Sequence, residues 1–300
     1  MARTFVVPLD GSEAAEQALP LAERLARQVG ATLHLVTVLD PAARPGTDSP
    51  DTAADLEREE RHLAEECVER AAEAARTAHG LSARPGVLTG PPATALAQYA
   101  RSHGADLIVM TTHGRGGLSR WWLGSVADRL LRRATVPVLL LPLRTHPQPT
   151  EFHRILVAQS GEPGDDAVLE RALALATPVS GAALRLVRVV PESAPVLSPL
   201  GAYPTQGGPD WATRQSLEAR TALARTAKRV GGRGGKVTTE VIAAASVAET
   251  ILRAADAMAA DLVAVGTHGA GAVERLILGS VADKVIRGAG RPVLVVPVTA

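Results

Sequence analysis

Two stretches decide the fold: TTHGRGGLSRWWLGSVADRLLRRATVPVLLLP at residues 111–142 and GTHGAGAVERLILGSVADKVIRGAGRPVLVVP at residues 266–297. They are identical at 17 of 32 positions without a gap, and GADLIVM and AADLVAV precede them. Further upstream, FVVPLDGSEAAEQALPLAERLA from residue 5 matches ILVAQSGEPGDDAVLERALALA from residue 155. Similarity over whole halves indicates two copies of one domain rather than a solenoid of short units.

The chain length agrees with two domains. Three hundred residues is about twice the size of an ordinary domain. We expect domains at 1–145 and 151–300, joined by a short linker within 143–152, where Pro147 and Pro149 cannot donate backbone hydrogen bonds. The stretch 191–209 holds five prolines and three glycines. It falls where the first copy has its 41–50 loop, so we interpret it as an irregular crossover.

Each copy alternates apolar strands with helices. In the first copy we expect strands at 5–9, 31–39, 87–90, 106–111 and 136–142, and helices at 14–29, 52–79, 93–103 and from Ser125 onward. This order predicts a five-stranded parallel sheet in a three-layer α/β/α sandwich, Rossmann-like or flavodoxin-like, in each copy. Because only 2% of residues are aromatic, the core must be aliphatic. Such sheets bind ligands at the carboxyl ends of their strands, where the winding direction reverses.

Composition excludes several classes of partner. Lys and Arg number 32 against 31 Asp and Glu, and they are spread along the chain, which argues against nucleic acid. No apolar run reaches the ~18 residues of a membrane span. The start MARTFVVPLDGSE has no leader pattern, so we expect a cytoplasmic protein. The single cysteine, Cys67, allows neither a disulfide framework nor a thiolate metal site.

A glycine-containing loop follows each fourth strand. The chain runs His-Gly, nine residues, Gly-Ser and then a helix. Glycines allow close backbone approach, and N–H groups at a helix start attract anions, so a phosphate is the natural ligand. The loop residues are Gly114, Gly124 and Ser125 in the first copy, and Gly269, Gly279 and Ser280 in the second.

A second interpretation needs no ligand. Ser125 and Ser280 are each followed three residues later by an aspartate, as in a helix with a serine N-cap. Neither loop is a Walker A motif, and GGRGGK at 231–236 fails as one, because residue 230 is valine and Val237 follows the lysine. No GxGxxG fingerprint follows a first strand. Spacing alone leaves phosphate binding and capping both open.

The order of elements, the sequence Asp10-Gly11-Ser12 after the first strand, and Gly-Thr-His-Gly-x9-Gly-Ser at 266–280 closely resemble the universal stress protein family. The resemblance covers nearly the whole chain as two tandem copies. The family pattern Gly-x2-Gly-x9-Gly-Ser/Thr marks members that bind ATP. The resemblance therefore implies ATP or a related adenine nucleotide as the ligand, alone or with Mg²⁺.

The family's site residues can be transferred to the first copy. Adenine and ribose would lie at the ends of the first two strands, and the phosphates on the glycine loop. Arg115 follows Gly114 and could reach a phosphate, although its counterpart in the second copy is Ala270. The family's first glycine is replaced by Thr111, which continues the strand, where a β-branched residue is suited. The transferred residues are Pro8, Asp10, Val38, Thr111, Gly114, Arg115, Gly124 and Ser125.

The second copy has the opposite departure. It keeps all the glycines, but Ser160 stands where the first copy has the aspartate, so a charge-assisted hydrogen bond of about 1 to 3 kcal/mol is lost. We therefore predict two nucleotide sites of unequal strength, with the first favoured. The transferred residues are Ala158, Ser160, Val189, Gly266, Gly269, Gly279 and Ser280.

We expect a regulatory protein rather than an enzyme, with no catalytic residue and no metal site. His113 and His268 precede the loops, but no catalytic partner stands at suitable spacing, so both are interpreted as loop-positioning residues. Alternatives are a nucleotide-free scaffold, a slow ATPase, and a flavoprotein, which the absence of a flavin-type loop disfavours. The resemblance also implies an internal pseudo-dimer through the closing strands 136–141 and 291–296, a homodimer, and a protein partner that the sequence does not identify.

Overall fold

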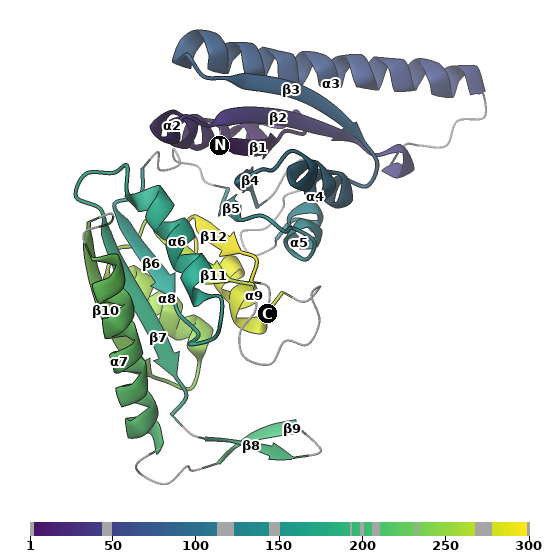
Figure 1. The fold of residues 1–300 in the computed structure, drawn as a ribbon. Helices are drawn as coiled ribbons and strands as arrows, with labels where there is room; N and C mark the ends of the chain where they lie inside the picture. Colours follow the sequence, from purple (N-terminus) through teal and green to yellow (C-terminus); the bar gives the residue numbers. More distant parts are fainter. Residues whose placement is uncertain are drawn as a thin grey trace. The chain divides into compact units, whose positions relative to one another are not determined.

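The computed structural model describes residues 3–43, 50–112, 123–143, 151–192, 194–198, 201–205, 211–231, 233, 235–267 and 278–298. The chain divides into two compact units, Met1–Glu151 (unit 1) and Phe152–Ala300 (unit 2). Figure 1 shows both, with unit 1 in purple to blue and unit 2 in green to yellow. Most of the predicted linker, 144–150, lies outside the described residues.

Unit 1 is a five-stranded parallel sheet with the order β3-β2-β1-β4-β5. The helices α2 and α3 cover one face, and α4 and α5 pack together on the other (Figure 1). In chain order the elements are β1 (Thr4–Pro8), α1 (Glu13–Glu16), α2 (Leu19–Val29), β2 (Thr32–Leu39), η1 (Pro41–Ala43), α3 (Pro50–His79), β3 (Ala83–Thr89), α4 (Pro92–Ser102), β4 (Leu107–Thr111), α5 (Ser125–Leu131) and β5 (Val138–Leu141).

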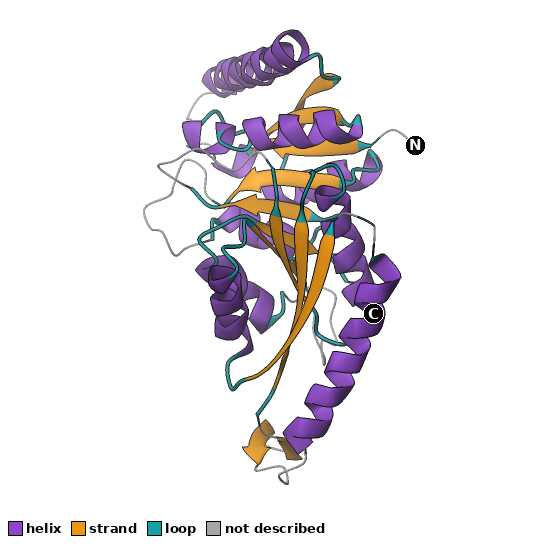
Figure 2. Ribbon diagram, turned by 90° about the vertical axis from the view of Figure 1, so that its left-hand side faces the viewer, coloured by secondary structure: helices purple, strands orange, loops and turns teal. Residues whose placement is uncertain are grey.

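Unit 2 repeats this topology with the parallel order β10-β7-β6-β11-β12. Its orange strands have purple helices on both sides in Figure 2, so the predicted three-layer fold is confirmed. The elements are β6 (Arg154–Ala158), α6 (Asp165–Ala176), β7 (Ala183–Val190), β8 (Ala194–Ser198), β9 (Gly201–Thr205), α7 (Trp211–Val230), β10 (Lys236–Ala243), α8 (Val247–Ala257), β11 (Leu262–Gly266), α9 (Ser280–Gly288) and β12 (Val293–Val296).

Two expectations about local structure were wrong. The expected helix 14–29 is interrupted between α1 and α2, because Pro20 has no N–H to donate and fits only the first turn of a new helix. The stretch 191–209 was expected to be irregular but contains the antiparallel hairpin of β8 and β9, with Val196 opposite Tyr203. A two-stranded ribbon has only edge strands, which tolerate proline. Residues 193, 199–200 and 206–209 lie outside the described residues.

The core is aliphatic, as the composition predicts. Val6 and Val7 of β1 are fully buried, as are Leu156 and Val157 of β6. Each such side chain contributes about 1.5 to 3 kcal/mol by leaving water. In the described part of the chain, no helix is both long and apolar enough to cross a membrane.

An aspartate before the fourth strand ties each sheet together. The N–H of Thr4 donates to Asp106 at 3.0 Å, and the N–H of Arg154 donates to Asp261 at 3.0 Å. Burial raises the pKa of Asp261, and the backbone N–H groups of His153 and Arg154 act in the opposite direction. The aspartates of GADLIVM and AADLVAV thus have a structural role that fixes where the first strand of each unit begins.

Candidate functional site

The candidate site of each unit lies where the winding of the sheet reverses. In unit 1 the chain runs from β1 outward to β2 and β3, then returns to β4 on the other side of β1. Unit 2 repeats this with β6 between β7 and β11. The carboxyl ends of the central strands at such a reversal are where open parallel sheets bind ligands.

The described residues of the predicted site lie at these strand ends. Pro8 and Ala158 end β1 and β6, and Thr111 and Gly266 end β4 and β11. Val38 and Val189 each occupy the last position but one of the adjacent strand, β2 or β7. The remaining described members follow the strands directly or begin the next helix: Asp10, Gly124, Ser125, Ser160, Gly279 and Ser280.

A backbone hydrogen bond closes the loop after the fourth strand in both units. The N–H of Gly124 donates to the carbonyl of Thr112 at 2.8 Å, and the N–H of Gly279 donates to that of Thr267 at 2.7 Å. Each bond returns the start of α5 or α9 to the end of its strand. The loop residues 113–122 and 268–277, which include the predicted Gly114, Arg115 and Gly269, lie outside the described residues.

The interpretation of the loop serines as N-caps was wrong in both units. Gly124 is the N-cap of α5, with φ −59° and ψ 148°, and Gly279 caps α9 with φ −59° and ψ 145°. Ser125 and Ser280 are therefore the first helical residues. A glycine N-cap has no side chain to accept the first N–H groups of the helix, which the helix itself leaves without acceptors. The N–H of the capping glycine itself donates to the residue that follows the fourth strand, so the helix start lies beside that strand end.

The aspartates in these first turns form ion pairs within the helix. Arg132 donates to Asp128 at 3.1 Å, and Arg287 donates to Asp283 at 3.0 Å, each one turn further along the helix. Their spacing suggested a capping role, but each helix begins one residue earlier than such a role requires. The ion pairs of the two aspartates stabilise their helices.

In unit 1 the turn after β1 is built around Asp10. Its Oδ1 accepts hydrogen bonds from the N–H of Ser12 at 3.0 Å and from its hydroxyl at 2.5 Å. The Ser12 hydroxyl in turn accepts from the N–H of Ala15 and caps α1. Gly11 between them has φ 76°, a conformation that favours glycine. Asp10 therefore shapes the turn as well as being the predicted ribose contact.

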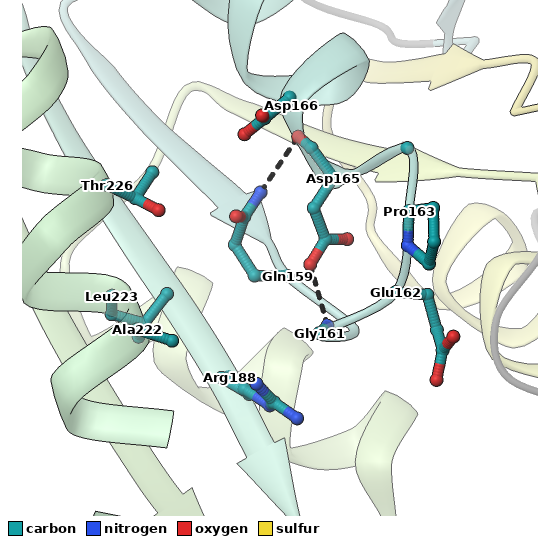
Figure 3. A pocket seen from close by; sticks show the side chains of 11 residues that line it. Gln159, Gly161, Glu162, Pro163, Asp165, Asp166, Arg188, Ala222, Leu223 and Thr226 are labelled. Carbon is teal, nitrogen blue, oxygen red and sulfur yellow. Dashed lines mark hydrogen bonds between the residues drawn. The ribbon is translucent and has the colours of Figure 1, made fainter. Parts of the chain in front are cut away.

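In unit 2 a different residue brings a carboxylate to the same turn. Asp165, the first residue of α6, accepts from the N–H and hydroxyl of Ser160 at 2.9 Å each, through Oδ1. Its Oδ2 accepts from the N–H of Gly161 at 2.6 Å (Figure 3). The sequence comparison missed Asp165, because it aligns with Ala15. Its only signal was the aspartate at the start of a helix five residues after Ser160.

The departure at Thr111 is mild in backbone terms. Thr111 is buried in β4 opposite Leu141, and Gly266 is paired in the same way with Val296 in β11. Both continue their strands, as we predicted for the threonine. The difference between the units at this position is therefore confined to the side chain.

A pocket of about 210 Å³ lies beside the Ser160 turn of unit 2, between the sheet and α7. Figure 3 shows Asp165 and Asp166 at the start of α6, Arg188 on β7, and Ala222, Leu223 and Thr226 on α7. No pattern in the sequence predicts this pocket.

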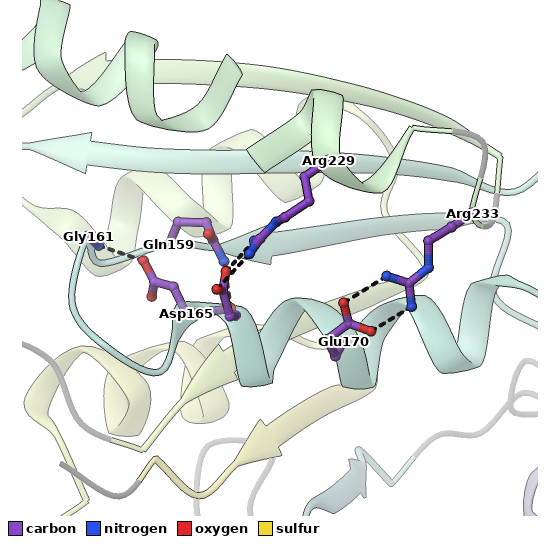
Figure 4. A network of polar contacts seen from close by, with 7 residues as sticks. Gln159, Gly161, Asp165, Glu170, Arg229 and Arg233 are labelled. Atoms are coloured by element: carbon purple, nitrogen blue, oxygen red, sulfur yellow. Dashed lines mark hydrogen bonds and ion pairs between the residues drawn. The ribbon is translucent and has the colours of Figure 1, made fainter. Parts of the chain in front are cut away.

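Arg229, in the last turn of α7, and Arg233, just beyond the end of α7, form ion pairs with α6 (Figure 4). Arg229 donates to Asp166 and thereby lowers the pKa of that carboxyl group. Arg233 donates to both oxygens of Glu170, at 3.0 and 2.8 Å. These pairs link the C-terminal end of α7 and the segment that follows it to α6.

Unit 1 has a cluster of ring side chains between β2 and α4. Nδ1 of the buried His34 lies 3.0 Å from the hydroxyl of Tyr99, and the ring of His103 stacks on Tyr99 at 3.9 Å. Burial lowers the pKa of His34, and the nearby His103 and Arg84 lower it further. The counterpart of His34 in unit 2 is Arg185. Thr4 pairs with Thr32, two residues before His34, and the matching Arg154 pairs with Ala183, two residues before Arg185.

Taken together, the fold and the loops define a tandem α/β protein with one glycine-closed loop at the winding reversal of each copy. The family model described as "Universal stress protein family" matches residues 1–142 and 151–297. The chain therefore belongs to the universal stress protein family.

Similar proteins include tandem and single-domain members. A universal stress protein of Mycobacterium tuberculosis H37Rv is 28% identical over 296 residues, covering 97% of this chain and 95% of that protein. One from Methanocaldococcus jannaschii is 33% identical over 142 residues, covering 46% of this chain and 81% of that protein. A solved universal stress protein from Archaeoglobus fulgidus has a TM-score of 0.69 at 22% identity, covering 98% of this chain and 96% of that one. The last similarity bears on the fold alone.

Proposed function

We propose that this protein binds ATP or a related adenine nucleotide and acts as a nucleotide-dependent regulatory protein in the stress response, without rapid turnover. The observation that carries the proposal is the repeated loop closure. In both units a glycine N–H returns the helix start to the fourth strand, and that glycine is the N-cap. Backbone N–H groups at such a helix start suit a phosphate.

The chemistry of the described residues fits a nucleotide. In unit 1, Val38 and Pro8 would contact the base, Asp10 the ribose, and the N–H groups beyond Gly124 the phosphates. In unit 2, Val189 and Ala158 correspond for the base and Gly279 for the phosphates. The unit 2 turn has a carboxylate from Asp165, but both of its oxygens already accept hydrogen bonds from the turn. This supports a weaker site in unit 2.

We propose that any Mg²⁺ enters with the nucleotide. Among the described residues, no group of three or more His, Cys, Asp and Glu side chains could hold a metal ion. Mg²⁺ commonly keeps several waters and uses phosphate oxygens with one or two protein ligands. The hydroxyls of Ser125 and Ser280, at the helix starts, suit that limited role.

We propose a binding protein rather than an enzyme. Hydrolysis requires a base that positions water. In the described turns after β1 and β6, Asp10 and Asp165 each accept hydrogen bonds that shape their own turn. Incubation with ATP and Mg²⁺ should release phosphate no faster than the Gly124→Val/Gly279→Val double variant does; a higher rate in the wild type would instead support a slow ATPase.

Mass spectrometry of the purified protein after denaturation tests the proposal directly. Co-purifying ATP or ADP, or saturable calorimetric binding of added ATP, is the expected result. A chain without bound nucleotide that also fails to bind ATP at saturating concentration would be a nucleotide-free scaffold.

We also propose that two chains form a homodimer in the cytoplasm and act through a protein partner. The support for this is the family to which the chain belongs. Light scattering coupled to size-exclusion chromatography should give twice the chain mass of 31.1 kDa. A mass of one chain at micromolar concentration would contradict the dimer.

A further inference from the structure

The pocket of unit 2 contains a half-buried cation that has no acceptor. The guanidinium of Arg188 lies over Gly161, where an added Cβ would come within 2.1 Å of Nη2. Within the described ranges no side chain or carbonyl accepts a hydrogen bond from Arg188. An arginine remains charged at any physiological pH and carries five N–H donors. Such a group on a pocket wall points to an anionic ligand.

The carboxylates around the pocket are mostly committed elsewhere. Asp165 accepts from Ser160 and Gly161, and Asp166 is paired with Arg229. Of the described carboxylates that line the pocket, Glu162 and Asp165 have no cationic partner, and Figure 3 shows the Glu162 side chain turned away from Asp165 and Asp166. Among the described residues, the pocket thus has one cation without an acceptor, beside two carboxylates that no cation neutralises. Because these carboxylates would repel a second negative charge on the ligand, the pocket suits a singly charged anion better than a dianion.

The size and walls of the pocket restrict the ligand further. The volume of about 210 Å³ lies below the roughly 300 to 1,000 Å³ of pockets for drug-sized molecules. Ala222 and Leu223 of α7 give an apolar wall, and Gln159 and Thr226 add polar groups. A small ligand with a short aliphatic body matches these walls.

The same position in unit 1 is built differently. Val36 pairs with Pro8 in unit 1, and Val187 pairs with the matching Ala158 in unit 2. The residues that follow them, Thr37 and Arg188, therefore correspond. Thr37 is buried, and its hydroxyl donates to the carbonyl of Leu9 at 2.8 Å. The polar group of unit 1 is therefore satisfied within the protein, whereas that of unit 2 is left for a ligand.

We propose that unit 2 binds a small monocarboxylate in this pocket, independently of any nucleotide. The carboxylate accepts paired hydrogen bonds from the Arg188 guanidinium, a geometry for which arginine is suited. The aliphatic part of the ligand contacts Leu223 and Ala222.

Calorimetric titration of the full chain with butyrate, at low salt and pH 7.5, tests the proposal. Saturable binding is expected in the wild type, with affinity reduced about tenfold or more in Arg188→Gln, since a hydrogen bond to a charged group is lost. Arg188→Lys keeps the charge but loses the paired geometry and should lie between them. The matched control is Arg185→Gln, on the same strand but three residues away, where Arg185 pairs with Glu240. It should bind as the wild type does.

A second variant keeps the test sharp if Arg188→Gln does not fold. Ala222 is an exposed helix position, so Ala222→Phe should fold and obstruct the pocket from α7, abolishing butyrate binding. Inorganic phosphate, largely a dianion at this pH, should bind more weakly than butyrate. Absence of saturable butyrate binding, equal binding by the wild type and Ala222→Phe, or tighter binding of phosphate would each overturn the proposal.

Discussion

The turns that follow β1 and β6 have the same backbone role but obtain their carboxylate from different positions. In unit 1, Asp10 accepts from Ser12, two residues later. In unit 2, Asp165 reaches back from the start of α6 to Ser160 and Gly161. By contrast, the loop closures at Gly124 and Gly279 are almost identical. Duplication has kept the geometry fixed by backbone hydrogen bonds, whereas the side chain that serves a given turn has changed.

The largest difference between the units is expected from removing these carboxylates. Asp165→Ala leaves three hydrogen bonds without an acceptor, so we expect it to lower the free energy of unfolding by about 3 kcal/mol. Asp10→Ala removes the two hydrogen bonds from Ser12, and the loss of these two bonds should cost about 1 to 2 kcal/mol. Urea unfolding followed by circular dichroism measures both. Equal losses would mean that the turns do not differ in this way.

Substitution of the glycines in the two turns should give the next largest difference in stability. Gly11 and Gly161 both have positive φ, 76° and 88°, so alanine at either costs about 1 to 2 kcal/mol. At Gly161 the new Cβ must also displace the guanidinium of Arg188. The thermal midpoint should therefore fall further for Gly161→Ala than for Gly11→Ala. The reverse order would contradict the close contact of Arg188 with Gly161.

Lowering the pH should reduce the stability of unit 1 more than that of unit 2. This difference should be smaller than those expected from the substitutions above. Because the pKa of His34 is lower in the folded chain than the ordinary 6.5, the unfolded chain takes up the proton first. The stability that neutral His34 contributes is present above pH 6.5 and is lost as the pH falls through its folded value. His34→Gln should flatten this decline in unfolding free energy between pH 7.5 and 5. Arg185→Gln, at the matching position of unit 2, should leave the decline unchanged.

The ion pair between α6 and the segment after α7 should have the smallest effect. Arg233 and Glu170 are both about half exposed, so Arg233→Gln should cost no more than about 0.5 kcal/mol. The cost should shrink further in 0.5 M salt. The measurement is urea unfolding at low and at high salt. A loss above 1 kcal/mol that added salt does not reduce would mean that this pair contributes more than an exposed ion pair does.

The sequence was a good guide where backbone periodicity and repeats decide the structure. The alternation of strands and helices along the chain, the start of α5 near Ser125 and the strand position of Thr111 all followed from the sequence pattern. Prediction from the sequence was wrong or incomplete where the structure depends on which partner a single group forms a hydrogen bond with. Whether Ser125 or Gly124 caps α5 depends on one backbone hydrogen bond to Thr112, and Asp165 reaches its turn only through the start of α6. Neither choice leaves a periodic signal.

The pocket and the hairpin were missed for related reasons. The Arg188 pocket depends on how α7 packs across β7, which sequence spacing does not report. The hairpin of β8 and β9 lies in a segment whose prolines suggested irregular structure, although proline is tolerated in edge strands.

Calorimetric titration with ATP tests most directly the central claim that the two units hold nucleotide sites of unequal strength. Asp10→Ala should weaken the tighter site by roughly five- to a hundredfold, since a charged acceptor is lost, and Asp10→Asn, which keeps the acceptor for Ser12, separates this from damage to the turn. Gly279→Val should remove the weaker site and leave the tighter one intact. Equal affinity and stoichiometry for the wild type, Asp10→Ala and Gly279→Val would contradict the account.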